Sequence, residues 1–126
     1  MAEPVAERRP SGLQLGRLGY GAANVGNLYR AMTDEDAWAV LEAAWESGIR
    51  YFDTAPHSGL GLSERRLGSF LATKPRGDYV VSTKVGRLLR PSPETAHLLD
   101  DANQFAVPAS LRRVWDFSAD GIRASL

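Results

Sequence analysis

The chain has 126 residues, so one domain at most is expected, and fifteen basic residues balance fifteen acidic ones. Near-zero net charge gives no indication of a nucleic-acid partner, and the absence of cysteine excludes disulfides and thiolate catalysis. Only two histidines occur, without zinc-type ligand spacing, and no apolar run reaches the ~18 residues of a membrane span, so we expect a cytoplasmic protein without metal or membrane contact.

The first ten residues are polar and contain no apolar signal-peptide segment, so residues 1–10 are expected to form a disordered tail. Residues 12–26 (GLQLGRLGYGAANVG) then alternate apolar and other residues, with glycines between them. This pattern predicts a short hairpin near Leu13–Leu18 and a strand near Leu18–Gly21. The later glycines indicate either a close backbone approach to a ligand or a simple turn, and taken alone they favour the turn.

A helix is predicted over residues 34–47, with Thr33 as its N-cap and Gly48 as a left-handed C-cap. Three acidic residues fill its first turn, where the helix dipole stabilises negative charge. Its apolar face follows the spacing i, i+3, i+4, i+7: Ala37, Val40, Leu41 and Ala44. Two tryptophans seven residues apart on this helix, Trp38 and Trp45, are expected to pack in the core.

The next elements continue an alternation of strands and helices. Residues 49–53 (IRYFD) predict a short strand, and Ser63 is expected to cap a second helix that ends at Lys74–Pro75. Its buried stripe is Leu67, Phe70 and Leu71. The β-branched run over residues 79–85 predicts a further strand. Strand, helix, strand, helix, strand in this order predicts right-handed crossovers and a parallel sheet.

Residues 86–115 have little periodicity and are predicted to form a long loop, which in a compact domain is functional or disordered. Four arginines make this stretch locally basic, and a solvated surface is favoured over a phosphate site: Arg87, Arg90, Arg112 and Arg113. A last helix is expected to begin after Ser118. Its sequence runs for about two turns to Leu126.

Asp53 and Lys84 stand near the ends of two successive predicted strands. Because the C-terminal ends of parallel strands share one face, an acid and a lysine should meet there. A lysine held by a carboxylate can lower the pKa of a nearby acid, or act as a nucleophile where it is partly desolvated. A structural ion pair that closes the strand ends is an equally good interpretation of the spacing.

Four segments carry a resemblance to a known family. The stretch GIRYFDTAPHSGLGLSERRLG together with VVSTKVGRLL resembles the aldo-keto reductases, and LGYGAANVGNLY and VWDFSADGIRASL do so at matching positions. Within the family, these segments are similar to the branch of aldose (fucose or galactose) dehydrogenases and pyridoxal dehydrogenase. The resemblance extends from about Leu13 onward.

The resemblance implies a (β/α)8 TIM barrel that binds NAD(P)(H) and moves a hydride between the nicotinamide and the carbonyl or alcohol carbon of a sugar or small aldehyde. It also implies a catalytic aspartate, tyrosine, lysine and histidine. The aspartate and lysine correspond to Asp53 and Lys84. Gly21 and Ala22, with Asp53, correspond to positions near the nicotinamide ribose.

The sequence departs from the family at Ser58, which stands in the position of the catalytic tyrosine. A phenol has a pKa of about 10 that a lysine can lower, whereas an aliphatic hydroxyl is a far weaker acid. Losing a general acid typically costs ~10²–10⁴ in rate. The neighbouring His57 is interpreted as a residue of the substrate-pocket rim. Trp115 is expected either to line that pocket or to anchor the long loop.

Length is the second departure, because a complete barrel of this type needs about 250 residues. The predicted fold is therefore α/β: an incomplete TIM barrel of about three βα units, residues 11–126, with an N-terminal hairpin. The family's histidine corresponds to a position beyond Leu126. Unpaired strand edges would favour self-association or a partner that completes the barrel.

By the resemblance the protein is an oxidoreductase, but whether it is an active enzyme stays open at the level of sequence, and the 126 residues alone are expected to be inactive. The main hypothesis is an NAD(P)-dependent oxidoreductase of the aldo-keto reductase type, impaired in this short chain. The alternative is a catalytically inactive relative that acts as a structural or interaction segment. A flavodoxin-like binding domain would explain the order of elements but not the acid and lysine at matching strand ends.

Overall fold

The computed structural model describes residues 7–8 and 14–126. Its first two strands, β1 (Glu7–Arg8) and β2 (Gln14–Leu15), pair antiparallel. The predicted hairpin is therefore displaced toward the N-terminus, and Glu7–Arg8 corrects part of the expected tail. The polar pair Glu-Arg gives no strand signal in the sequence. The rest of residues 1–10 lies outside the described residues.

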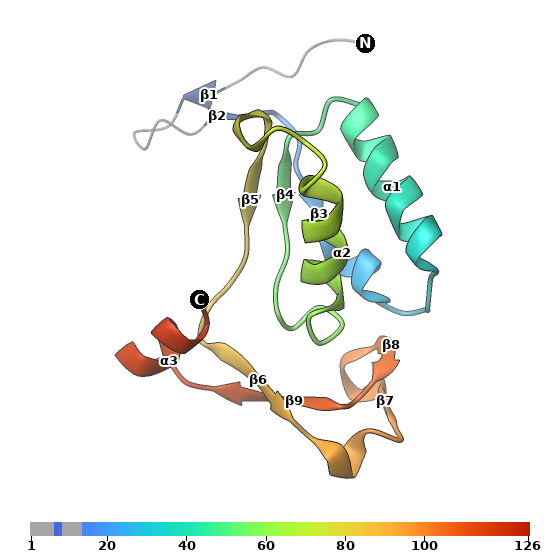
Figure 1. The fold of residues 1–126 in the computed structure, drawn as a ribbon, viewed down its shortest axis with the longest axis vertical. Coiled ribbons are helices and arrows are strands. Elements are labelled where there is room, and N and C mark those ends of the chain that lie inside the picture. Colours follow the sequence, from blue (N-terminus) through green and yellow to red (C-terminus); the bar gives the residue numbers. More distant parts are fainter. Residues whose placement is uncertain (1–6, 9–13) are drawn as a thin grey trace.

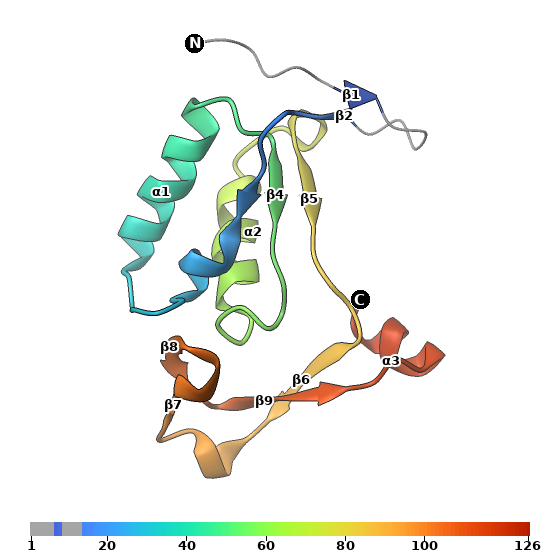
Figure 2. The same cartoon turned by 180° about the vertical axis from the view of Figure 1, so that it is seen from behind.

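The centre of the molecule is a parallel sheet with strand order β3-β4-β5. Its strands are β3 (Tyr20–Gly21), β4 (Tyr51–Asp53) and β5 (Val80–Ser82). Gly21 lies beside Asp53, and Asp53 beside Ser82, so the strand ends are level. Helices α1 (Asp34–Glu46) and α2 (Leu62–Leu71) cover the same face of the sheet (Figure 1), and the view from behind shows the other face without a helix (Figure 2).

The helix-covered face holds the main core. Its largest fully buried apolar side chains come from both helices, from β4 and from the segment after β3: Leu41, Leu67, Phe70, Phe52 and Val25. Trp45 stacks on Phe52 with ring centroids 6.3 Å apart, as expected for a core tryptophan. Trp38 is 40% exposed and packs edge-on against Phe70 of the core. The prediction that both tryptophans pack in the core is therefore fully confirmed for Trp45 and only partly for Trp38.

The ends of the helices confirm one predicted cap and correct another. Thr33 accepts a hydrogen bond from the Asp36 amide at 3.0 Å, and Gly48 has φ of 97° after α1. The cap of α2 is Gly61, with φ of 89°. Ser63 lies inside α2 and is fully buried. Its hydroxyl makes tertiary hydrogen bonds and does not cap the helix. Helix α2 ends at Leu71 and β5 covers only part of residues 79–85.

Residues 86–115 are not a structureless loop, which corrects the prediction. Strand β6 (Arg87–Pro91) pairs antiparallel with β9 (Leu111–Trp115), and β7 (Leu99–Asp100) pairs with β8 (Phe105–Pro108). These strands are short, and arginine and proline residues interrupt the period-two alternation from which strands are predicted. We call residues 86–118 the hairpin arm. Helix α3 (Ala119–Ala124) follows it, capped by Ser118 as predicted.

The arm passes beneath the carboxyl ends of the parallel strands (Figures 1 and 2). A second small core joins it to the body: Leu60, Phe105 and Val107 are buried, with Leu28, Leu62, Leu89 and Leu111 packed against them. In the described part of the chain, no helix has the length and hydrophobicity to cross a membrane. The parallel sheet is an open arc of three strands, so the described residues form no closed barrel.

Candidate active site

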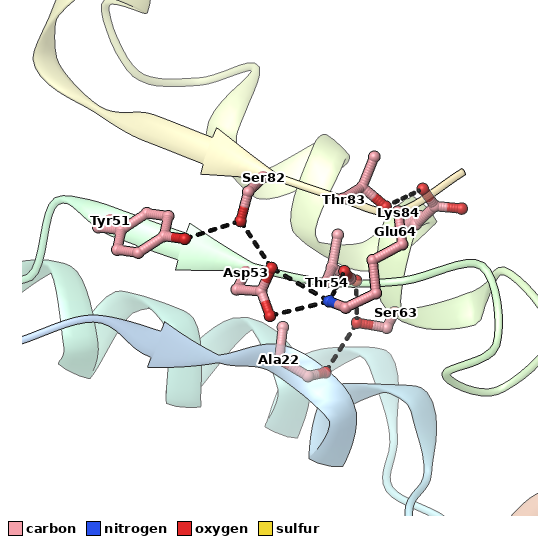
Figure 3. Close-up of polar contacts among 9 residues, drawn as sticks. All are labelled: Ala22, Tyr51, Asp53, Thr54, Ser63, Glu64, Ser82, Thr83 and Lys84. Carbon is pink, nitrogen blue, oxygen red and sulfur yellow. Dashed lines mark hydrogen bonds and ion pairs between the residues drawn. The ribbon is translucent and has the colours of Figure 1, made fainter. Parts of the chain in front are cut away.

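The ends of β4 and β5 bring Asp53 and Lys84 into direct contact. The Lys84 Nζ atom lies 3.0 Å from Asp53 Oδ2 and 3.2 Å from Oδ1, and it donates to the Thr54 carbonyl at 2.9 Å (Figure 3). An ammonium group has three N–H donors, so these acceptors account for all of them. The lysine is therefore held by the carboxyl ends of the strands rather than extended freely into solvent.

This ion pair borders open space. The side chains of Lys84 and Asp53 are 60% and 43% exposed. A buried structural pair that seals the strand ends would show far less exposure, so that interpretation of the spacing is not supported. Exposed ion pairs contribute little to stability, typically about 0–1 kcal/mol, so stability gives a weak reason for this arrangement.

A hydrogen-bonded hydroxyl group supports the carboxylate from the other side. Ser82 donates to Asp53 Oδ1 at 2.6 Å, and Tyr51 and Ser82 are joined through their hydroxyls at 3.0 Å. Burial is the largest single influence on the Asp53 pKa and raises it. The hydrogen bonds from Ser82 and Lys84, the lysine charge and the Thr54 amide together outweigh burial and lower that pKa below its ordinary 3.8. Asp53 is accordingly ionised at neutral pH.

A pocket of about 500 Å³ opens beside this pair. All seven residues that the sequence singled out lie on its wall: Gly21, Ala22, Asp53, His57, Ser58, Lys84 and Trp115. They come from the ends of β3, β4 and β5, from the loop after β4 and from the hairpin arm. The structure therefore gathers these residues at one place, while the role of each remains a prediction.

The loop after β4 is fixed by a close contact of two backbones. A Cβ atom placed on Gly26 would lie only 2.6 Å from the Ser58 carbonyl oxygen, and Gly59 has φ of 70°. Ser58 itself is 6% exposed and lines the pocket. The fully buried Ser63 donates to the Ala22 carbonyl at 2.7 Å and so ties α2 to the segment after β3. These contacts hold the position of Ser58 firmly.

His57 is bound by the arm. Arg113 donates from Nε to His57 Nδ1 at 2.7 Å and from Nη2 to the His57 carbonyl at 2.9 Å. Burial lowers the pKa of His57 below 6.5, and the charges of Arg113 and Arg87 lower it further. Because Nδ1 accepts a hydrogen bond, the neutral ring carries its proton on Nε2. His57 is thus a wall residue in a fixed tautomer.

Arg113 corrects the expectation of a solvated basic surface. Its Nη2 atom lies 2.6 Å from Asp100 Oδ2, and the two side chains are 13% and 8% exposed. No local pattern predicts this pair, because Asp100 and Arg113 belong to two different two-stranded ladders. Arg87 instead lies over the Trp115 ring at 3.9 Å, beside the pocket, and Trp115 is 61% exposed.

Ser82 is a further residue of the site that was not expected from the sequence. It stands two positions before Lys84, and side chains two apart on a strand point to the same face. Period two could therefore have placed the Ser82 hydroxyl beside the acid and lysine. In the described residues, no cluster of histidine, aspartate and glutamate could hold a metal ion.

Comparison with known proteins agrees with this fold and site. The model of the aldo/keto reductase family matches residues 17–114, a span that contains the sheet, both body helices and most of the pocket wall. The chain belongs to the aldo/keto reductase family, which confirms the family predicted from the sequence.

Two individual relatives show how much of a full-length family member the chain matches. The chain is 66% identical over 125 residues to a D-threo-aldose 1-dehydrogenase from Pseudomonas sp, covering 98% of this chain and 37% of that protein. It is 42% identical over 123 residues to a pyridoxal 4-dehydrogenase from Microbacterium luteolum, covering 91% of this chain and 35% of the relative. It thus spans little more than a third of the length of either relative.

A solved structure extends the likeness to the fold. A glycerol dehydrogenase from Gluconobacter oxydans matches 95% of this chain and 32% of its own length, with a TM-score of 0.64 and 26% sequence identity. The parallel sheet and its helices therefore correspond to part of a larger aldo-keto reductase structure.

Proposed function

We propose that the chain forms the first three βα units of a (β/α)8 barrel and one wall of the active site of an NAD(P)(H)-dependent oxidoreductase. The substrate class is a sugar or small aldehyde, or the corresponding alcohol, and the expected location is the cytoplasm. The observation that carries the proposal is the contact of Lys84 with Asp53 on a pocket, within the segment that the family matches. The names of the two relatives support the substrate class.

The pocket floor suits the nicotinamide end of the cofactor. A Cβ atom on Gly21 would meet nothing within 4 Å, so the backbone there leaves room for a flat ring and its ribose. Gly21, Ala22 and Asp53 would hold that end, with Asp53 available as an acceptor for a ribose hydroxyl. When bound, the nicotinamide supplies or accepts the hydride.

In the direction of reduction, the carbonyl carbon gains the hydride and its oxygen gains a proton. The Lys84 ammonium lies at the pocket wall, where its positive charge would stabilise the negative charge that develops on that oxygen. Asp53 keeps this charge in place. Ser58 stands where the family has its proton-donating tyrosine, and a serine hydroxyl gives up a proton much less readily. We therefore expect slow turnover.

A second candidate function is that of a structural or interaction segment without catalysis, for which self-association or a partner would complete the barrel. Two observations favour it: Ser58 replaces the acid, and every N–H donor of Lys84 is already engaged. Val81 and Val85, 38% and 40% exposed, lie on or just after β5, at the edge of the open sheet. Sedimentation of the purified chain at several concentrations tests for association.

Reduction of a generic aldehyde by NADH or NADPH, followed by absorbance, tests the main proposal. Within a full-length barrel, the wild-type sequence should turn over slowly, Ser58→Tyr should increase the rate by about 10²-fold or more, and Lys84→Met should abolish it. Lys74 is the only other lysine, and it lies at the far end of α2 beside Glu42, so Lys74→Met is the matched control. Absence of both turnover and nicotinamide binding in wild type and Ser58→Tyr would overturn the proposal.

A further inference from the structure

A directed chain of hydroxyl groups leads to the Asp53 carboxylate. The Ser82 hydroxyl donates to Asp53 Oδ1 at 2.6 Å, and the Tyr51 hydroxyl lies 3.0 Å from Ser82 Oγ (Figure 3). A serine hydroxyl has one proton. Because Ser82 uses it toward the carboxylate, Tyr51 must be the donor to Ser82.

The sheet explains why these side chains meet. Tyr51 and Asp53 are two apart on β4, and Ser82 and Lys84 are two apart along β5 and its continuation, so each pair shares a face. Asp53 is the register partner of Ser82. Phe52 points to the opposite face and is fully buried in the main core. The four polar residues therefore line the face that no described helix covers.

The distances indicate a charge-assisted arrangement. Hydrogen bonds from a hydroxyl to an ionised carboxylate are typically about 2.5–2.7 Å long, and the Ser82 bond falls in this range. Bonds in such chains polarise one another, so the Tyr51 hydroxyl strengthens the bond that Ser82 makes. Ser82 thereby occupies Oδ1, and Oδ2 makes the shorter of the two contacts with Lys84.

We propose that Ser82, oriented by Tyr51, is the positioning residue that fixes the rotation of the Asp53 carboxylate and thereby holds the Lys84 ammonium at the pocket wall. Neither hydroxyl lies on the pocket wall itself, so both act through the carboxylate. The consequence for catalysis rests on the proposed function, whereas the positioning itself does not.

A partly exposed carboxylate needs such a support. Asp53 is 43% exposed, and its side chain would otherwise rotate and exchange Lys84 for water. The serine hydrogen bond is also the strongest of the contacts that lower the Asp53 pKa against the effect of burial. Its removal should therefore be visible in the titration of this single carboxyl group.

Carboxyl ¹³C NMR of the purified chain against pH tests the proposal, with the Asp53 signal assigned by its loss in Asp53→Asn. Ser82→Ala should raise the Asp53 midpoint, Tyr51→Phe should raise it by less, and Ser82→Thr, which keeps the hydroxyl, should restore the wild-type value. Thr83→Val is the matched control, because the Thr83 hydroxyl donates instead to Glu64, at 2.8 Å.

An Asp53 midpoint in Ser82→Ala equal to that in Thr83→Val would overturn the proposal. If Ser82→Ala does not fold, Tyr51→Phe decides, since it leaves Ser82 in place: an unchanged midpoint rejects the chain of donors. The titration needs neither cofactor nor substrate. A full-length barrel without reductase activity, together with the expected midpoints, would reject the proposed function and keep the positioning role.

Discussion

The α/β body, residues 20–85, and the hairpin arm are held by different forces. Nine buried residues form one continuous core in the described body, including Leu41, Phe52 and Phe70. The small core at the arm has three buried residues, and one of them, Leu60, belongs to the body. What fixes the arm is a set of directional polar contacts, such as the two hydrogen bonds between Asn27 and Ala106.

Because of this difference, the two parts of the pocket wall should be sensitive to different kinds of substitution. The strand ends that carry Asp53 and Lys84 are held in place by the burial of apolar side chains. Such a core tolerates apolar substitutions that keep its volume. The part of the wall formed by His57 depends on Arg113 and Asp100, whose bonds each require a particular geometry. Loss of one buried partner leaves the other charge without compensation.

The largest effect should come from the body. Phe52→Ala removes a fully buried ring between Trp45 and Tyr20 and should lower the free energy of unfolding by about 3–5 kcal/mol. Urea denaturation followed by tryptophan fluorescence measures it. Leu18→Ala, at a residue that is 71% exposed, should change stability by less than about 0.5 kcal/mol. Equal effects of the two would contradict the placement of the core.

Arg113→Ala should have the next largest effect, and a local one. It leaves Asp100 without its partner and releases His57, at a cost of about 2–3 kcal/mol confined to the arm. Hydrogen exchange should accelerate in residues 105–115 and stay unchanged in α1. Arg112→Ala, next to it and exposed, is the control. Faster exchange throughout α1 would show that arm and body are a single cooperative unit.

The smallest effect is a dependence of stability on pH through His57. Burial, then the charges of Arg113 and Arg87, lower its pKa in the folded chain below 6.5, and Asp100 opposes this shift. The unfolded chain therefore binds the proton more tightly. The stability contributed by His57 is complete above pH 6.5 and is lost as pH falls through the lower folded value.

Thermal unfolding between pH 7.5 and 5 measures this dependence. His57→Gln should flatten the decline in Tm on the acid side, whereas His97→Gln, at an exposed residue, should leave it unchanged. A decline that is equally steep in His57→Gln would assign it to other groups.

The sequence predicted the body well for a physical reason. Helical spacing, the Thr33 cap and the β-branched strand residues are local signals, and local signals define local structure. The junction of Asp53 and Lys84 followed from one rule about parallel strands. Ser63 was placed wrongly as a cap because its partners, Thr54 and Ala22, are distant in sequence.

The arm could not be predicted in the same way. Its strands are two to five residues long, and their pairings join residues up to 28 positions apart, as between Arg87 and Trp115. Four arginines in such a segment suggest solvent exposure, and nothing local distinguishes Arg113 from its neighbour Arg112. Only the folded chain shows which guanidinium meets Asp100.

The touching backbones of Gly26 and Gly59 have a consequence for how this protein can change over evolutionary time. Even a methyl group at either position would force apart the segment after β3 and the loop after β4 that contains Ser58. Side chains on the pocket wall can therefore be substituted one at a time, whereas the spacing between these two crossing segments can change only if both glycine positions change together.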